Sequence, residues 1–172
     1  MIDPTGNAPP RLPRALESEE CHAAVQAALA AATRPLWSGG TVAASVVPLT
    51  HALRRALRAS ASSGMVRRGL EAAESALDVE QRGLDALPAE EALRHGGRVS
   101  RLLLVANDGA ERFNRRVERL VVLHAPRVLP CIIECDSPSL GALLYGPGEV
   151  AKVVLAERKT AVVAILQALA RR

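Results

Sequence analysis

After Gly97 the sequence alternates three times between a short apolar run and a longer segment with helical spacing. The first run, residues 101–106, is apolar at every position after Arg101, which is typical of a strand buried on both faces of a sheet. From Ala110 to Val121 the apolar residues recur at helical spacing. The same pairing returns at residues 128–134 with 137–144 and at residues 150–155 with 157–171. Three such units predict an α/β fold, a three-layer α/β/α sandwich with helices on both faces of a small sheet.

The chain before Gly97 is expected to form a mostly helical N-terminal extension. Four of the 11 prolines fall within residues 1–15, which predicts an extended or mobile arm. Residues 33–48 are expected to form a loop with a poorly paired strand, and the Ala-Ser-Gly run at 59–64 a linker. Helical spacing and capping residues predict helices at 18–32, 51–58, 65–78 and from Pro88 to Gly96.

The composition limits the kind of core that this chain can build. Apolar residues make up 49% of the sequence but aromatic residues only 2%, so Ala, Val, Leu and Ile must fill the interior. Such a core buries less area per residue than one with large rings. A partner or a second copy of the chain would then supply part of the stability.

The chain is basic. It carries 22 basic residues, of which only Lys152 and Lys159 are lysines, and a net charge of +4. A basic surplus is the electrostatic footprint expected for a nucleic-acid or anionic-membrane partner. A compositionally biased genome that favours arginine would produce the same surplus without any function, and the two explanations stay open at this stage.

The sequence indicates a reducing compartment and no membrane partner. The three cysteines, Cys21, Cys131 and Cys135, are odd in number and form no C-x-x-C pair, so a disulfide framework is not expected. No apolar run approaches 18 residues, the length that a membrane-spanning helix needs. We therefore expect a cytoplasmic protein.

No pattern in the sequence predicts catalysis, a metal or a cofactor. The four histidines are far apart and share no short motif with Cys, Asp or Glu. Gly146-Pro147-Gly148 and Lys152 lack the spacing of a phosphate-cradling loop. His124 is expected to cap the last carbonyls of its helix rather than to act as a catalyst. The chain is therefore expected not to be an enzyme.

The C-terminal part resembles the bacterial L-seven-Ae-like ribosomal-protein family. The resemblance is carried by Gly97 to Ala110, by the basic helix after it, and by the Leu140-Gly141 pair before the last strand. It implies a domain at 64–172 that binds structured RNA, typically a kink-turn, at a helix N-terminus before the first long strand. The matching stretch, Arg82-Gly83-Leu84-Asp85, lacks the family's Asn, and the segment before it is acidic.

The other end resembles the YlxR-like family. Asp3-Pro4-Thr5-Gly6 is similar to that family's signature, and Cys21-His22-Ala23-Ala24 to its Cys-led helix. The two families occur fused in some bacteria, and the chain is identified as such a fusion. Residues 1–58 are then a truncated or degenerate YlxR-like segment.

These observations predict a non-catalytic RNA-binding protein, associated with the ribosome or translation, that contacts phosphates through arginine-rich helices. The candidate RNA-binding residues are Arg54, Arg55, Arg58, Arg67 and Arg68 on the N-terminal helices, Arg82 and Gly83 in the matched stretch, and Arg112, Arg115, Arg116 and Arg119 on the helix after the first strand.

Two alternatives stay open. The second arginine group is equally well explained as a solvated helix face, partly neutralised by Glu111 and Glu118. The whole chain could instead be a protein-interaction or oligomerisation module that kept the fold and lost kink-turn recognition. In that case the Ala-rich helices at 18–32 and 157–171 would pack on a protein partner or a second copy.

Overall fold

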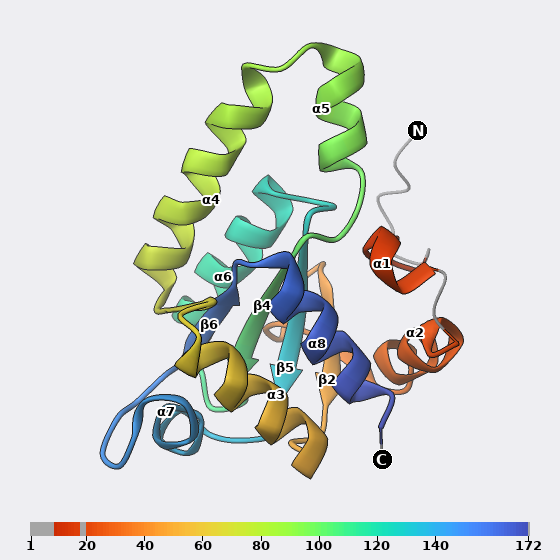
Figure 1. Cartoon of the computed structure of the whole chain (residues 1–172). Coiled ribbons are helices and arrows are strands. Elements are labelled where there is room, and N and C mark those ends of the chain that lie inside the picture. The colour runs from red at the N-terminus through yellow and green to blue at the C-terminus, as the bar shows by residue number, and fades with distance from the viewer. Residues whose placement is uncertain (1–8, 18–19, 172) are drawn as a thin grey trace.

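The computed structural model describes residues 9–17 and 20–171 (Figure 1). The predicted signature at residues 3–6 lies outside this range. In chain order the elements are α1 (Arg14–Glu17), α2 (His22–Ala30), β1 (Thr33–Pro35), β2 (Ala43–Val47), α3 (His51–Ser62), β3 (Val66–Arg68), α4 (Leu70–Asp85), α5 (Ala89–Gly96), β4 (Arg101–Ala106), α6 (Glu111–Leu123), β5 (Val128–Ile133), α7 (Ser137–Tyr145), β6 (Val153–Ala156) and α8 (Lys159–Leu169).

The strands form one mixed sheet in the order β1-β2-β5-β4-β6-β3. β2, β5 and β4 run parallel to one another, whereas β1, β6 and β3 each pair antiparallel with their neighbours. The strand predicted at 101–106 is confirmed, and β5 and β6 match the other two to within a few residues. Pro130 lies inside β5, one residue before its pairing with β2 begins at Cys131. Its missing N–H therefore does not interrupt that pairing.

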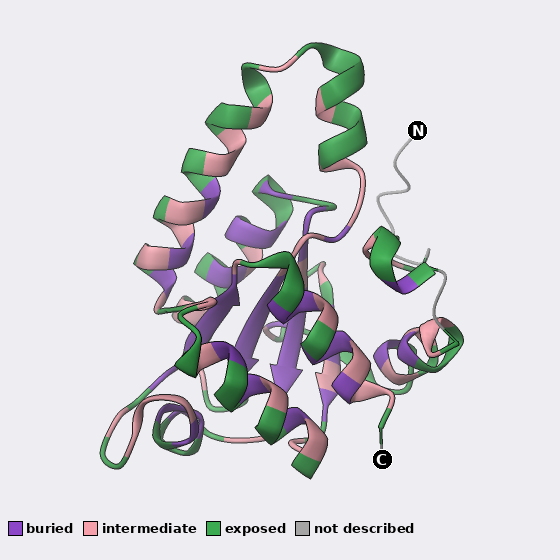
Figure 2. Ribbon diagram, in the orientation of Figure 1, coloured by how far each residue is buried: buried purple, intermediate pink, exposed green. Residues whose placement is uncertain are grey.

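Helices cover both faces of the sheet, so the predicted α/β sandwich is confirmed. Alternate residues of β4 serve the two faces: Leu102 and Leu104 join one apolar cluster, and Leu103 and Val105 join the other. α2, α3, α7 and α8 pack on the first face, and α4 and α6 on the second. Figure 2 shows the buried strands between these layers, and the far end of α4 with α5 projecting beyond them.

The predicted division near residues 58–64 does not separate two cores. β1 and β2 extend the same sheet as β4 and β6, and α3 packs beside α8. The first apolar cluster contains Leu12, Leu16, Val25 and Leu29 together with residues of the C-terminal strands. The N-terminal segment is therefore part of a single fold, and its relation to the YlxR-like family stays a prediction.

Several local predictions were wrong because tertiary contacts override weak sequence signals. Residues 9–15 are not an arm: Leu12 is buried, and the carbonyl of Arg11 accepts from the Val99 N–H at 2.9 Å. The linker predicted at 59–64 is instead the last turn of α3 and a turn closed by Gly64. The helix predicted at 65–78 starts five residues later, after strand β3.

Gly141 allows α7 to lie directly against the chain that leads into β6. A methyl group at this position would meet the carbonyl oxygen of Glu149 at 2.2 Å and the Cα of Val150 at 2.5 Å. Both atoms belong to the backbone and cannot swing aside. Gly83, on the exposed side of α4, has no atom within 4 Å of such a methyl group.

We expect Gly141→Ala to lower the free energy of unfolding by about 1–3 kcal/mol, because overpacking forces the backbone apart. Gly83→Ala is the matched control and should raise the free energy of unfolding by about 0.5–1 kcal/mol, because alanine favours the helix. Urea unfolding followed by circular dichroism measures both values. A neutral Gly141→Ala would show that α7 and the 149–150 segment do not touch.

Candidate nucleic-acid interface

The structure divides the predicted arginines between opposite faces of the sheet. Arg54, Arg55 and Arg58 lie on α3, which covers one face, whereas the α6 arginines lie on the helix that covers the other. The sequence predicted that Arg67 and Arg68 lie on a helix, but the structure places both on the edge strand β3. The fold therefore offers no single surface that contains all the candidates.

Helix α3 exposes its arginines because its apolar residues face the sheet. The Thr50 hydroxyl caps the helix by accepting from the Leu53 N–H at 3.2 Å. Leu53 and Leu57 are buried against the core. Arg54, Arg55 and Arg58 then point to solvent, and none of them forms an ion pair within the part of the chain that the structure describes.

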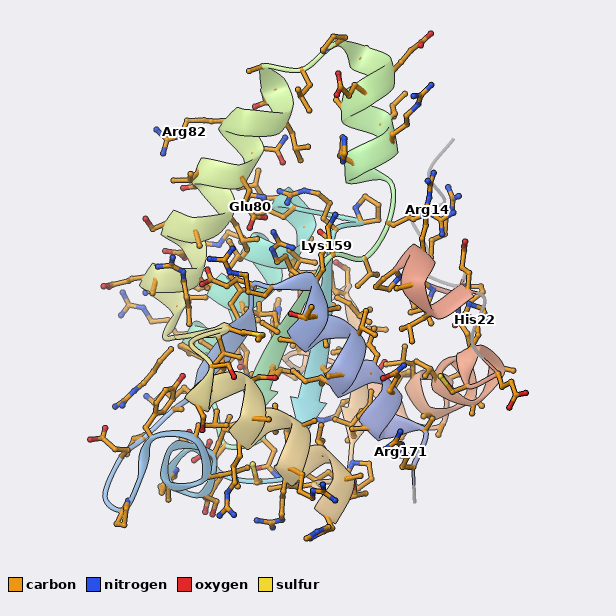
Figure 3. The ribbon with its side chains drawn as sticks, viewed as in Figure 1. Arg14, His22, Glu80, Arg82, Lys159 and Arg171 are labelled. Atoms are coloured by element: carbon orange, nitrogen blue, oxygen red, sulfur yellow. The ribbon has the colours of Figure 1, made fainter. Side chains whose placement is uncertain are left out.

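A groove of about 560 Å³ lies on the surface between α3 and α8, which pack beside each other. It is lined largely by the small side chains of Ala52, Ala56, Ala59, Ala164 and Ala168, with His51, Arg55, Gln167 and Arg171 around them. Residues 50–62 and 158–171 contain no Asp or Glu. Figure 3 shows Arg171 at the end of α8, near α2. We call Arg54, Arg55, Arg58, Arg171 and this groove the α3–α8 face.

The arginines of β3 are engaged within the protein. Arg67 pairs with Glu157. Arg68 pairs with Glu149 at 2.5 Å and lies over the Tyr145 ring, 5.1 Å from its centroid. Both side chains remain partly exposed, but a phosphate would have to compete with these carboxylates for them.

The arginines of α6 are partly neutralised. Arg115 pairs with Glu111 and stacks 4.4 Å from the Trp37 ring centroid, and Arg116 lies 3.4 Å from Glu74 on α4. Glu118 does not pair with an arginine: it accepts from the Thr41 N–H and hydroxyl, both at 3.1 Å. Among the described residues Arg112 and Arg119 have no acidic partner.

The match of Arg82-Gly83 to an RNA-binding helix N-terminus is wrong. Both residues lie in the last turn of α4, where the helix ends in carbonyl groups that repel phosphate. Arg82 is exposed and donates to the Asp78 carbonyl oxygen at 3.4 Å. The start of α4 is at Leu70, after Gly69 with φ +95°, and its first turn carries Glu71. A carboxylate in that turn opposes anion binding.

The structure also contains a partly buried polar network that the sequence did not predict. Glu80 of α4 accepts from Arg101 at 2.8 Å and from Arg127 at 3.0 Å. Arg127 also donates to the Nδ1 of His124 at 3.2 Å, so His124 is neutral with its proton on Nε2. The network ties α4 to β4 and to the α6–β5 turn. Figure 3 shows Glu80 between α4 and the strands.

The His, Cys, Asp and Glu side chains were expected to hold no metal and to carry no catalysis. Among the described residues no three His, Cys, Asp or Glu side chains are placed to hold a metal ion. Burial raises the pKa of the Cys131 thiol to about 12 and that of Cys135 to about 11. Both thiols are therefore protonated near neutral pH and are poor nucleophiles.

None of the helices in the described part of the chain combines the length and the apolar character needed to cross a lipid bilayer.

No model of a known protein family matches the chain, and no curated protein matches its sequence. The two family resemblances therefore stay predictions, and the function is inferred from the charges and contacts of the surface.

The His124 network makes stability depend on pH. Burial, with a smaller contribution from Arg127, lowers the pKa of His124, while Asp78 and Glu80 oppose that shift. The unfolded chain, where the histidine pKa is about 6.5, then binds a proton more readily than the folded chain does. Stability from this group is complete above that value and is lost as the pH falls below it.

We expect the free energy of unfolding to fall between pH 8 and pH 5.5, with a His124 contribution of at most about 1.4 kcal/mol per pH unit. His124→Gln keeps an acceptor for Arg127 and removes the titration, so its pH dependence should be flatter. Urea unfolding of both proteins at several pH values gives the comparison. Identical pH profiles would exclude a contribution from His124.

Proposed function

We propose that this protein is a non-catalytic RNA-binding protein that holds the phosphate backbone of a structured RNA on the α3–α8 face. The observation that carries the proposal is the absence of acids on two adjacent basic helices, residues 50–62 and 158–171. Arg55 and Arg171 line an alanine-rich groove, and Arg54 and Arg58 are exposed beside it on α3. Neither of the two segments supplies a carboxylate to compete for these arginines.

The geometry suits contacts to the backbone rather than to stacked bases. Alanine side chains leave room for a sugar-phosphate chain to approach the helices closely, and arginine forks can then reach phosphate oxygens on either side. The three aromatic residues offer no platform there: Trp37 lies under Arg115, Phe113 packs against the second apolar cluster, and Tyr145 lies under Arg68. Binding is therefore expected to weaken steeply as salt rises.

RNA is favoured over other polyanions by the resemblance of residues 97–172 to the L-seven-Ae-like family. A role with the ribosome or in translation belongs to the same proposal. The family's own RNA-binding element has no counterpart at Arg82-Gly83, so the RNA contacts proposed here use a different surface of the fold. A cytoplasmic location also belongs to the proposal and is supported by the free thiols of Cys21, Cys131 and Cys135.

One observation favours the alternative, self-association. On α6, Val122 and Leu123 are 58% and 68% exposed, although both are large apolar residues. They line a hollow of about 630 Å³ with Trp37, Arg115, Glu118 and Arg119. A two-fold dimer needs a self-complementary surface. An apolar centre flanked by charges of both signs fits a second copy of this chain.

The RNA proposal is tested with the double variant Arg55→Gln/Arg58→Gln. Each lost phosphate contact should reduce the slope of log K against log[salt] by about 0.7–0.9, so the variant should lose about 1.5 units of slope and at least about tenfold in affinity at low salt. Fluorescence anisotropy with a kink-turn RNA, an RNA duplex and a DNA duplex at two salt concentrations measures this.

The matched control is Arg112→Gln/Arg119→Gln, which removes two unpaired arginines from the opposite face. It should bind RNA as the wild type does. Equal losses in both double variants would mean that RNA binding depends on total charge, not on the α3–α8 face. Absence of RNA binding even at low salt would refute the proposal and leave self-association as the better candidate.

If the protein self-associates through the α6 hollow, the wild type should be a dimer and the Leu123→Glu variant a monomer. A charge at the centre of an apolar interface loses its hydration, and the apolar contacts around it do not offset that cost. Sedimentation velocity at several protein concentrations measures the change. Arg82→Gln, at an exposed residue of α4, is the control because it also lowers the net charge by one. A wild-type protein that is monomeric at all concentrations would exclude this function for the α6 hollow.

A further inference from the structure

A second basic concavity, distinct from the α3–α8 face, lies between α1, the turn from α5 to β4, and the start of α8. Its volume is about 350 Å³. Arg14 reaches it from α1, Arg94 and Arg98 from the α5–β4 region, and Lys159 from the first residue of α8. Figure 3 labels Arg14 and Lys159 on the two helices that border it. We call it the α1–α8 cleft.

The cleft is basic because its cations come from three distant parts of the chain and no acid lines it. Arg98 pairs with Glu17, and the hydrogen bond from Arg98 holds the pKa of that carboxyl below its ordinary value. Within the described residues Arg14, Arg94 and Lys159 have no acidic partner. Three uncompensated positive charges therefore face one small volume.

The wall of the cleft is held in place by specific contacts. Arg98 donates to the Leu12 carbonyl oxygen at 3.3 Å, and the Val99 N–H donates to Arg11 at 2.9 Å. Leu12 and Leu16 are buried on either side of Arg14. The segment that carries Arg14 is thus fixed to the turn before β4, and little ordering is needed when a ligand enters.

Apolar side chains form the other part of the lining. Val99 and Val162 are buried there, and Pro13 and Val163 complete the apolar part. Ser100 and His95 add hydroxyl and imidazole groups beside them. A few polar groups over an apolar floor are typical of small-molecule sites, and this volume is at the lower end of their range, about 300–1,000 Å³.

We propose that the α1–α8 cleft binds a nucleotide-sized phosphate monoester, with the phosphate against Arg14, Arg94 and Lys159 and the base against the valines. A phosphate monoester carries a charge of about −1.5 to −2 near neutral pH, and these three cations are sufficient to neutralise it. The ligand is either a free nucleotide or the 5′-phosphorylated end of an RNA. This inference does not depend on the α3–α8 face, because Arg14 and Arg94 lie outside it.

The test is a nuclear magnetic resonance titration of the full ¹⁵N-labelled chain with the four nucleoside monophosphates. We expect shifts in the amides of residues 13–15, 94–100 and 159–163. Adenosine and inorganic phosphate serve as partial ligands, and each should bind at least about tenfold more weakly than the monophosphate, because each lacks one half of the contacts. Inorganic phosphate binding as tightly as the nucleotides would overturn the proposed ligand class.

Two further RNA probes separate the sources of the phosphate. Shifts at the cleft with free nucleotides assign the site to a free ligand. Shifts that need a 5′-phosphorylated oligoribonucleotide, and that are lost with a 5′-hydroxyl end, assign it to an RNA terminus. No shift at these amides with any nucleotide or RNA overturns the proposal.

Arg14→Gln/Arg94→Gln is the informative variant, because both side chains are exposed and neither forms an ion pair among the described residues. It should weaken nucleotide binding by about tenfold or more while RNA affinity at the α3–α8 face stays as in the wild type. Arg112→Gln/Arg119→Gln removes the same number of charges and is the control; it should leave nucleotide binding unchanged. Unaltered nucleotide binding in the double variant, with its melting temperature unchanged, would contradict the assignment.

Discussion

The parallel pairing of β4 with β5 is the constraint on which the rest of the structure depends. Both strands are buried along almost their whole length, and alternate residues of each face opposite layers. A pair of strands that is apolar on both faces is stable only if both faces are covered. Because the chain has only three large rings, many small contacts must supply that cover. This explains why segments from both ends of the chain pack on one sheet.

This need for cover also determines where the charges lie. α3 and α8 bury their leucine, valine and alanine residues against one face and leave only cations and small residues outside. α4 lies on the opposite face, and one of its acids, Glu80, binds inward to Arg101 and Arg127, which belong to the sheet and the turn before β5. Three acids that pair with arginines, Glu74, Glu80 and Glu111, thus lie on the two helices of this face.

The sequence predicts well what depends on local pattern and poorly what depends on distant partners. β4, α5 and α7 are recognisable because an apolar run, a proline or a cap marks each of them. β2 lies in the segment expected to be a loop with a poorly paired strand, because Ala43-Ala44-Ser45 is weakly strand-forming. In the structure it pairs with both β1 and β5. Likewise Arg67 appears as free as Arg55 in the sequence, yet its partner, Glu157, lies 90 residues away.

The placement of the charges helps to separate function from composition. A genome biased toward arginine explains why 20 of the 22 basic residues are arginines, but it does not explain where the charges lie. Seven of the 18 acids lie on α4 and α6, namely Glu71, Glu74, Asp78, Glu80, Asp85, Glu111 and Glu118, and none on α3 or α8. The net charge of +4 therefore understates the potential over the α3–α8 face. A bias in composition alone would distribute acids over both sides of the protein. The absence of acids on the α3–α8 face is therefore the feature of the charge distribution that favours a polyanionic partner.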